Sequence, residues 1–184
     1  METDDFPGMC RETLDFLQTF IDSVPLNLTV NPISEDEFEA LVRDNRSSLN
    51  WRSYFGHYLS DESFHIAFKI TGSDTIDGAI LAVYSVSHKV LHLLLLESLI
   101  HTQRKHPLKG RLTALTVIAA TMLLTFLEGS KGAWIVEPDP LLIGHYSRFG
   151  FTRGFGEKSV MYASTETLQS MQTELLNTLR DSNT

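Results

Sequence analysis

Two glutamates lie where a carboxylate could accept a proton from a substrate. Glu97 is the only acid in a long apolar run, Val90 to Ile100. A carboxylate buried there would be poorly solvated, which makes it readier to take a proton. Glu137 follows the next apolar strand at its carboxyl end, where open α/β sheets usually bind ligands. The sequence leaves both glutamates open as the general base.

The loop from His101 to Arg111 could bind a small polyanion. It holds four basic residues among eleven, although the whole chain carries a net charge of −8. A helix begins directly after it, and the free amides of a helix N-terminus and a glycine turn bind phosphate groups well. Gly110 supplies the glycine. We expect a polyphosphate site here, and the alternative is a solvated surface loop.

A third segment, Asp139 to Phe151, combines polar side chains with a clear stop signal. It follows a short apolar strand and is expected to be helical up to Phe149, within the sequence Tyr146-Ser-Arg-Phe-Gly-Phe151. Gly150 stands where a helix C-terminus often needs a positive φ angle, and Phe151 begins the next strand.

The elements that must position these residues follow from apolar periodicity, turn residues and one capping box, Ser34 to Glu37. In chain order we expect a helix over 9–24 ended by Pro25, a strand over 26–30, a helix after Ser34, a helical stretch over 47–60, strands over 64–70, 78–86 and 90–100, a helix over 112–128, a strand over 133–136, a helix over 139–149, a strand or hairpin over 151–163 and a helix over 165–180.

This order predicts a mixed α/β (α+β) fold. The three strands between residues 64 and 100 are joined by tight turns and predict an antiparallel meander, whereas the later strand–helix–strand units require parallel crossovers. The run 90–100 could equally suit a helix, but its length and the turn before it favour a central strand buried on both faces. A central sheet flanked by helices, with extra N- and C-terminal helices, is the expected architecture.

The stretch 47–60 has two interpretations. Its aromatic side chains are Trp51, Tyr54, Phe55 and Tyr58. They have the spacing of a packed helix face, which predicts core, and they could equally line an apolar pocket for a substrate.

The strand, Asp, short helix and Tyr-x-Arg-x-Gly-Phe pattern resembles the signature of the GCN5-related N-acetyltransferase (GNAT) superfamily. The expected element order is similar to that fold over roughly residues 26–163 and identifies no subfamily. The resemblance implies that Tyr146 is the general acid toward the departing CoA thiolate. It also implies that Glu97 or Glu137 takes the proton of the attacking amine, and it places Asp139 where members commonly carry Asn.

The same resemblance implies acetyl-CoA as the acyl-donor cosubstrate. Its expected contacts are Leu99, Ile100, His101, Lys105, Lys109, Gly110, Arg111, Leu112, Asp139 and Arg148. The loop departs from the family's Arg/Gln-x-x-Gly-x-Gly/Ala motif in either register. If Gly110 is the second glycine, Leu108 replaces the first, and if Gly110 is the first, Leu112 replaces the second. His145 is expected to point away from Tyr146.

The resemblance therefore implies an acetyl-CoA-dependent N-acetyltransferase that acts on a primary amine of a small molecule or peptide, and a homodimer is possible. The alternative is a GNAT-fold binding or regulatory protein that has lost catalysis and binds CoA weakly or not at all. A toxin of this fold that acts on aminoacyl-tRNA is disfavoured, because it would need a positively charged face for the RNA.

Composition limits the remaining classes. The chain has 184 residues, 42% of them hydrophobic and 21% charged, which predicts one globular domain. We expect a helical extension at 1–25, the main domain at 26–163 and a packed C-terminal helix at 164–184. The net charge of −8 disfavours general nucleic-acid binding. One cysteine, scattered histidines and an acidic N-terminus predict no metal site and a cytoplasmic protein, and the 16-residue uncharged stretch 112–127 is too short to span a membrane.

Overall fold

The computed structural model describes residues 5–101, 103–154 and 159–182. Thr102 of the basic loop and residues 155–158 of the expected C-terminal hairpin therefore lie outside the described residues. Within them the strands are β1 (Leu28–Asn31), β2 (Ser63–Ile70), β3 (Gly78–Ser85), β4 (Val90–Ser98), β5 (Gly132–Val136), β6 (Thr152–Arg153) and β7 (Val160–Ser164). The helices are α1 (Phe6–Ser23), α2 (Glu35–Arg43), α3 (Phe55–Tyr58), α4 (Leu112–Phe126), α5 (Ile143–Ser147) and α6 (Thr165–Asp181), with 3-10 turns η1 (Trp51–Tyr54) and η2 (Pro140–Leu142).

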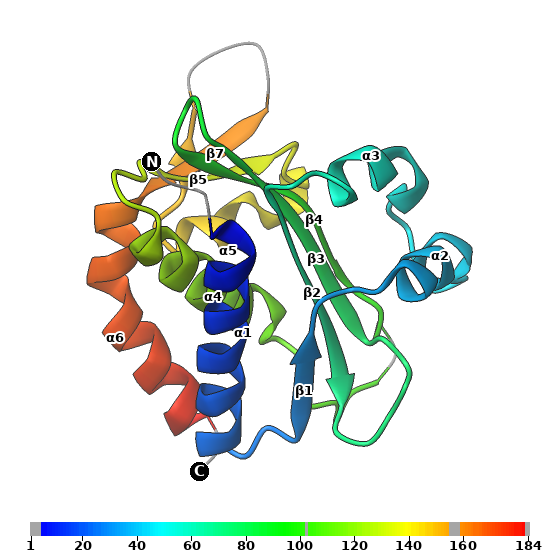
Figure 1. The fold of residues 1–184 in the computed structure, drawn as a ribbon. Coiled ribbons are helices and arrows are strands. Elements are labelled where there is room, and N and C mark those ends of the chain that lie inside the picture. The colour runs from blue at the N-terminus through cyan, green and yellow to red at the C-terminus, as the bar shows by residue number, and fades with distance from the viewer. Residues whose placement is uncertain (1–4, 102, 155–158, 183–184) are drawn as a thin grey trace.

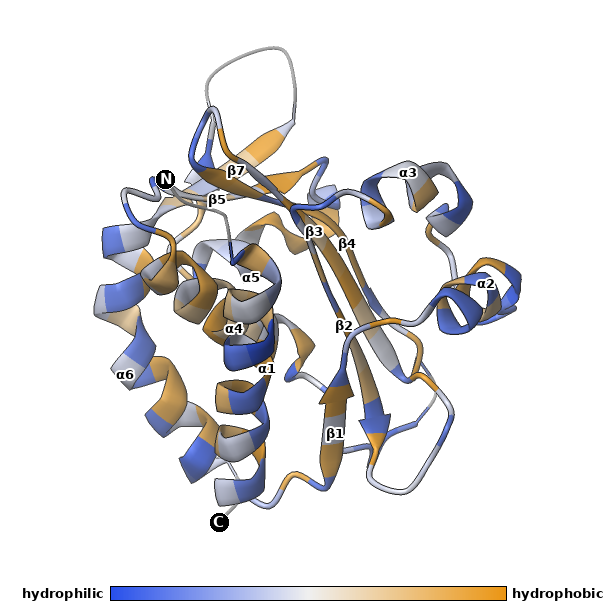
Figure 2. Cartoon of the chain, viewed as in Figure 1, coloured by the Kyte–Doolittle hydropathy of each residue, from blue (hydrophilic) through white to orange (hydrophobic). Residues whose placement is uncertain are grey.

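The described strands form one mixed sheet in the order β1-β2-β3-β4-β5-β7-β6, which confirms the expected fold class. Helices α1, α4 and α6 lie on one face, and α2 and α3 lie on the other (Figure 1). The strands and α4 are largely hydrophobic, whereas α1 and α6 also carry hydrophilic segments (Figure 2). This pattern follows from position, because α4 is enclosed between the sheet and the outer helices.

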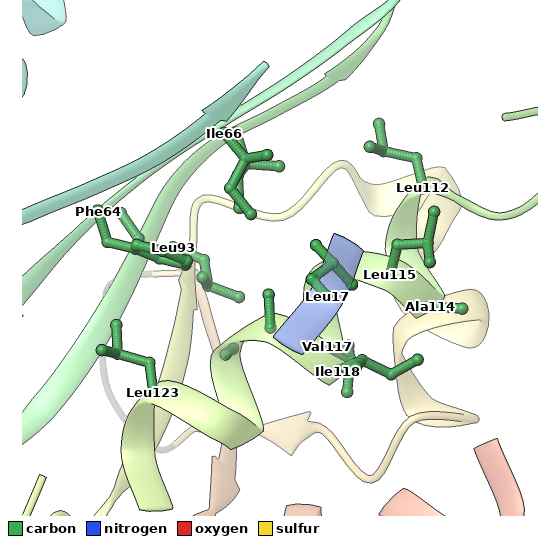
Figure 3. Packing of buried hydrophobic residues seen from close by; sticks show 14 of the residues in the cluster. Leu17, Phe64, Ile66, Leu93, Leu112, Ala114, Leu115, Val117, Ile118 and Leu123 are labelled. Atoms are coloured by element: carbon green, nitrogen blue, oxygen red, sulfur yellow. The ribbon is translucent and has the colours of Figure 1, made fainter. Parts of the chain in front are cut away.

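The main core lies between the sheet and α4. Leu17 of α1, Phe64 and Ile66 of β2 and Leu93 of β4 meet side chains of α4 such as Ile118 there (Figure 3). Residues of α6 join the same cluster, so both terminal helices share one core with the sheet. A second cluster, around Phe38 and Trp51, lies under α2 and α3.

The expected meander is confirmed, and the structure shows how the later strands pair. Strands β1 to β4 pair antiparallel, and β4 pairs parallel with β5 through the α4 crossover. Strand β5 then pairs antiparallel with β7, and β6 pairs with the far side of β7. The chain after α5 therefore runs to the sheet edge and returns between β5 and β6, so the second crossover does not join neighbouring strands.

Local signals are mostly confirmed. The Ser34–Glu37 capping box forms at the start of α2, and Gly150 has φ +92° after α5. The stretch 47–60 differs, because only residues 51–58 are helical, in two short turns. The residues before them form no helix, and the backbone N–H groups of Ser48 and Leu49 donate to the buried Glu97 carboxylate in place of helix carbonyls.

Candidate functional site

The central cavity opens where β4 and β5 separate. Their parallel pairing ends at Leu93 and Ile135, although β4 continues to Ser98. The pairing of β4 with β3 shifts by one residue at the same point, so that Leu94 is a β-bulge. A bulge re-aims the backbone and is common beside active sites. The edge of β4 that faces β5 is consequently without a strand partner from Leu94 onward among the described residues.

The cavity has a volume of about 610 Å³ and contacts both faces of the sheet. Its walls are residues 48–50, Tyr54, 93–98, His101, Leu108, Gly110, Leu112, Thr113, 135–139, Leu142, His145 and Tyr146. The structure thus brings together Glu97, His101, Gly110, Leu112, Glu137, Asp139 and Tyr146 of the residues expected from the sequence.

Tyr146 presents a buried phenol to this cavity. It comes from α5, only 5% of the residue is exposed, and no described residue makes a hydrogen bond with its hydroxyl group. Burial raises the pKa of the Tyr146 phenol, and the nearby Asp139 carboxylate raises it further. The hydroxyl therefore keeps its proton at neutral pH and is available to donate it.

Glu97 is buried, as expected from the sequence, but protein donors take the place of water around its carboxylate. The backbone N–H groups of Ser48 and Leu49, the hydroxyls of Ser47 and Ser48 and the indole N–H of Trp51 all donate to its carboxylate. The residue is 4% exposed. These donors take up both oxygens, so the carboxylate holds the loop in front of η1 in place.

Glu137 has the opposite surroundings. It follows β5, is exposed at the cavity wall and accepts no hydrogen bond from a described residue. Its backbone has φ +50°, a left-handed conformation that is uncommon for a residue other than glycine. Such backbone strain clusters at functional sites. Asp139, two residues on, instead accepts the Leu141 N–H at 2.9 Å and caps the η2 turn.

The N-terminus of α4 closes one end of the cavity. Its N-cap, Arg111, makes no side-chain cap, and no described residue accepts the N–H groups of Leu112, Thr113 or Ala114. Gly110 just before it has φ +71° with open space around its Cα. Free amides at a helix N-terminus attract anions such as phosphates.

Leu108 does not obstruct this end, although it stands at a place where the GNAT motif has glycine. Its side chain is buried and turns toward β3, where a Cβ added to Gly78 would lie 2.5 Å from Leu108 Cδ2. A leucine side chain is therefore accommodated by a glycine on the facing strand.

The basic side chains of the loop do not line this cavity. Lys105, Lys109 and Arg111 instead border shallow clefts on the far side of the loop, against residues 25–27. Arg148 is exposed and also lies outside the cavity wall. These four side chains therefore lie outside the wall of the central cavity, and their expected contacts with CoA stay a prediction.

Leu99 and Ile100 are likewise absent from the cavity wall. Both side chains are at most 2% exposed and lie in the two core clusters. The Leu99 N–H donates to the Asp77 carbonyl at 2.8 Å, so this amide is already paired.

His145 is a residue that the sequence interpretation placed wrongly. It lines the cavity beside Tyr146, and its Nε2 lies 3.0 Å from Thr113 Oγ1, which joins α5 to the first turn of α4. Burial lowers the pKa of His145, and the charge of Arg148 lowers it further. The signal was the i, i+3, i+4 spacing of Leu142, His145 and Tyr146, which would place all three on one face of the helix expected over 139–149.

Two negative findings concern the described residues only. None of their helices is long and apolar enough to cross a membrane. No group of three or more His, Cys, Asp or Glu side chains among them could hold a metal ion.

Comparison with known proteins gives structural matches alone. No protein-family model matches the chain, and no curated protein matches its sequence. The ribosomal-protein-S18-alanine N-acetyltransferase from Escherichia coli superimposes with a TM-score of 0.57 at 12% identity, over 75% of this chain and 94% of that one. The spermidine/spermine N-acetyltransferase SpeG from Vibrio cholerae gives 0.53 at 10% identity, over 78% and 96%. A chain of the KacTA–DNA complex gives 0.59 at 14% identity, over 80% and 99%.

Proposed function

We propose that this chain, which has the GNAT acetyltransferase fold, transfers an acetyl group from acetyl-CoA to a primary amine. The observation that carries the proposal is one cavity that joins three features without a hydrogen-bonding partner among the described residues: the edge of β4 beyond Leu93, the amides at the N-terminus of α4 and the phenol of Tyr146. The strand edge suits a ligand chain that carries amide groups, and the helix amides suit a diphosphate. The phenol suits a leaving group that needs a proton.

The reaction needs one bond made and one broken. The amine nitrogen attacks the thioester carbonyl, the C–N bond forms, and the C–S bond then breaks. A backbone N–H at the Leu94 bulge polarises the carbonyl, and the Tyr146 hydroxyl gives its proton to the departing thiolate. The proton lost by the amine goes to a carboxylate at the cavity wall.

We assign that carboxylate to Glu137. It lines the cavity, is exposed and has no hydrogen-bond donor among the described residues, so its oxygens are open to an ammonium group. Glu97 is already surrounded by five donors and would have to give up some of them to accept a proton. Glu97 is better suited to position the loop that forms the acceptor side of the cavity.

The test has a binding part and a chemical part. Saturating acetyl-CoA or CoA is expected to raise the Tm, since a ligand at about 100 times its Kd stabilises the native state by about 2.7 kcal/mol, and ATP is the control. Tyr146→Phe is expected to lower turnover by about 10²- to 10⁴-fold with an unchanged shift by CoA, because it removes a proton donor and leaves the diphosphate end intact. Turnover equal to wild type in Tyr146→Phe would contradict the assignment.

One observation favours a second function, a binding protein of the same fold without catalysis. Lys105, Lys109 and Arg111 do not line the cavity, so their charges contribute little to a diphosphate held there. Stabilisation by CoA without acyl transfer to any amine would support this alternative. No stabilisation by millimolar acetyl-CoA would contradict the acetyltransferase and favour the alternative, which binds CoA weakly or not at all.

The partners remain proposals. The acceptor is a small-molecule or peptide amine, and a homodimer is possible. We expect no general nucleic-acid binding, because the net charge is −8. One structural match, a chain from a DNA complex, is a weak argument in the other direction. The cytoplasmic location stays a prediction from the sequence.

A further inference from the structure

The acceptor side of the cavity is formed by elements on the opposite face of the sheet from α4. Residues 48–50 and Tyr54 belong to the segment that carries η1 and α3, and α4 lies across the sheet from them (Figure 1). Under the proposed function the diphosphate occupies the α4 end. The amine therefore enters past residues 48–54 and the η2 turn, where Leu142 completes the wall.

Several polar groups on this side are bonded within the protein. Glu97 and the Ser48 hydroxyl bond one another, Asn50 accepts the Ser53 N–H, and Asp139 accepts the Leu141 N–H. Glu137 is the one carboxylate of the wall that accepts no hydrogen bond from a described residue. Glu137 therefore offers both of its oxygens to an ammonium group, whereas Asp139 has one oxygen committed to the η2 turn.

The rest of the rim is apolar and exposed. Leu49 is 38% exposed and Leu142 39% exposed, and both line the cavity. Leu141, which precedes Leu142, is 90% exposed. The Tyr54 ring lies on the same wall. Apolar side chains gathered around a cavity mouth favour a ligand whose own apolar surface covers them.

We propose that the acceptor is a monoamine with an apolar body, whose single ammonium group meets Glu137 and whose carbon chain lies against Leu49, Tyr54 and Leu142. This inference rests on the proposed function and names its substrate class. A polyamine is disfavoured because its further ammonium groups would be placed on the leucine rim.

The test is acetyl transfer to a homologous series of linear amines from propylamine to hexylamine. Each methylene buried against the rim contributes about 0.8 kcal/mol, so kcat/KM is expected to rise about fourfold per methylene until the cavity is full. Butylamine is expected to exceed 1,4-diaminobutane and spermidine by about tenfold or more. A flat series, or a polyamine used as well as butylamine, would overturn the proposal. A C-terminally amidated tetrapeptide with N-terminal leucine and no charged side chain, added as a further arm, shows whether this amine class includes peptide N-termini.

A matched pair of variants tests the rim itself. Leu142→Glu adds a carboxylate at the cavity wall and is expected to shift the preference toward 1,4-diaminobutane by about tenfold. Leu59→Glu is the control, because Leu59 is 53% exposed and lies outside the cavity wall. Equal preferences in both variants would overturn the role of Leu142.

Failure of the proposed function has a different signature. If acetyl-CoA is bound but no amine is acetylated, binding of hexylamine and spermidine to the CoA-saturated protein is measured by calorimetry. Tighter binding of hexylamine supports the inference about the pocket even without turnover. Tighter binding of spermidine, or binding of neither amine, overturns it.

Discussion

The role of Glu97 can be decided by removing its charge and keeping its shape. In Glu97→Gln one carboxylate oxygen becomes an NH₂ group. One oxygen faces the Ser47 hydroxyl and the Trp51 indole N–H, and the other faces the backbone N–H groups of Ser48 and Leu49 as well as a hydroxyl. Hydroxyl groups can rotate to accept a proton, but an indole or backbone N–H cannot.

The smallest penalty therefore comes from placing the NH₂ group beside Trp51. This orientation leaves the buried indole N–H without an acceptor, and the four remaining bonds lose the assistance of a charge. An unpaired buried donor costs about 1–3 kcal/mol, so we expect Glu97→Gln to lower the free energy of unfolding by about 2–3 kcal/mol. For a domain of this size the change corresponds to a fall in Tm of about 4–12 °C.

The assay is thermal unfolding combined with acetyl-transfer kinetics on the same preparations. Glu39→Gln is the matched control, because Glu39 forms an exposed ion pair with Arg43 and its loss is expected to change stability by at most about 1 kcal/mol. Glu137→Gln is expected to lower turnover at an unchanged Tm. The reasoning is refuted if Glu97→Gln keeps the wild-type Tm and loses turnover about 100-fold or more while Glu137→Gln stays active.

Three further predictions concern stability. Burial lowers the pKa of His65 to about 4 from 6.5, so the unfolded chain binds the proton first as pH falls. Stability is full above pH 6.5, and urea unfolding at pH 7.5 and 4.5 is expected to show a loss of about 2–3 kcal/mol from this residue. His106 Nδ1 accepts the Leu108 N–H, so Nε2 carries the proton and donates a hydrogen bond to Asp77 at 2.9 Å. Asp77→Ala removes this acceptor and is expected to lower the free energy of unfolding by about 2 kcal/mol, measured by urea unfolding. Gly150→Ala is expected to lower the Tm by several degrees, since φ is +92° and a Cβ would lie 2.8 Å from Met171 Sδ.

Each of these predictions has a control. His65→Gln should lose less stability between pH 7.5 and 4.5 than wild type, and an equal loss would assign the titration to other groups. Asp74→Ala, at an exposed site in the same turn region, should change stability little. Gly72→Ala shares a positive φ of +85° but meets open space, so a cost equal to that of Gly150→Ala would argue against crowding by Met171.

The secondary structure could be predicted because its signals are local. The alternation of residues 64–70, the Ser34–Glu37 capping box and the stop at Gly150 each depend on residues within a few positions of one another. The resemblance to GNAT enzymes had the same basis, a short motif around Tyr146 and an order of elements. The place of β7 between β5 and β6 was not predicted, because residues 151–163 carry no local signal for which strand they pair with.

The sequence by itself determined most of the elements and that Tyr146 stands near the end of a short helix behind a strand. Only the tertiary structure decided which polar groups are free. Glu97 is bonded by residues 46 to 50 positions away, His145 meets Thr113 32 positions away, and the lysines at 105 and 109 turn from the cavity. The direction and partners of a side chain depend on distant segments packed against it, and this information is absent from any single stretch of sequence.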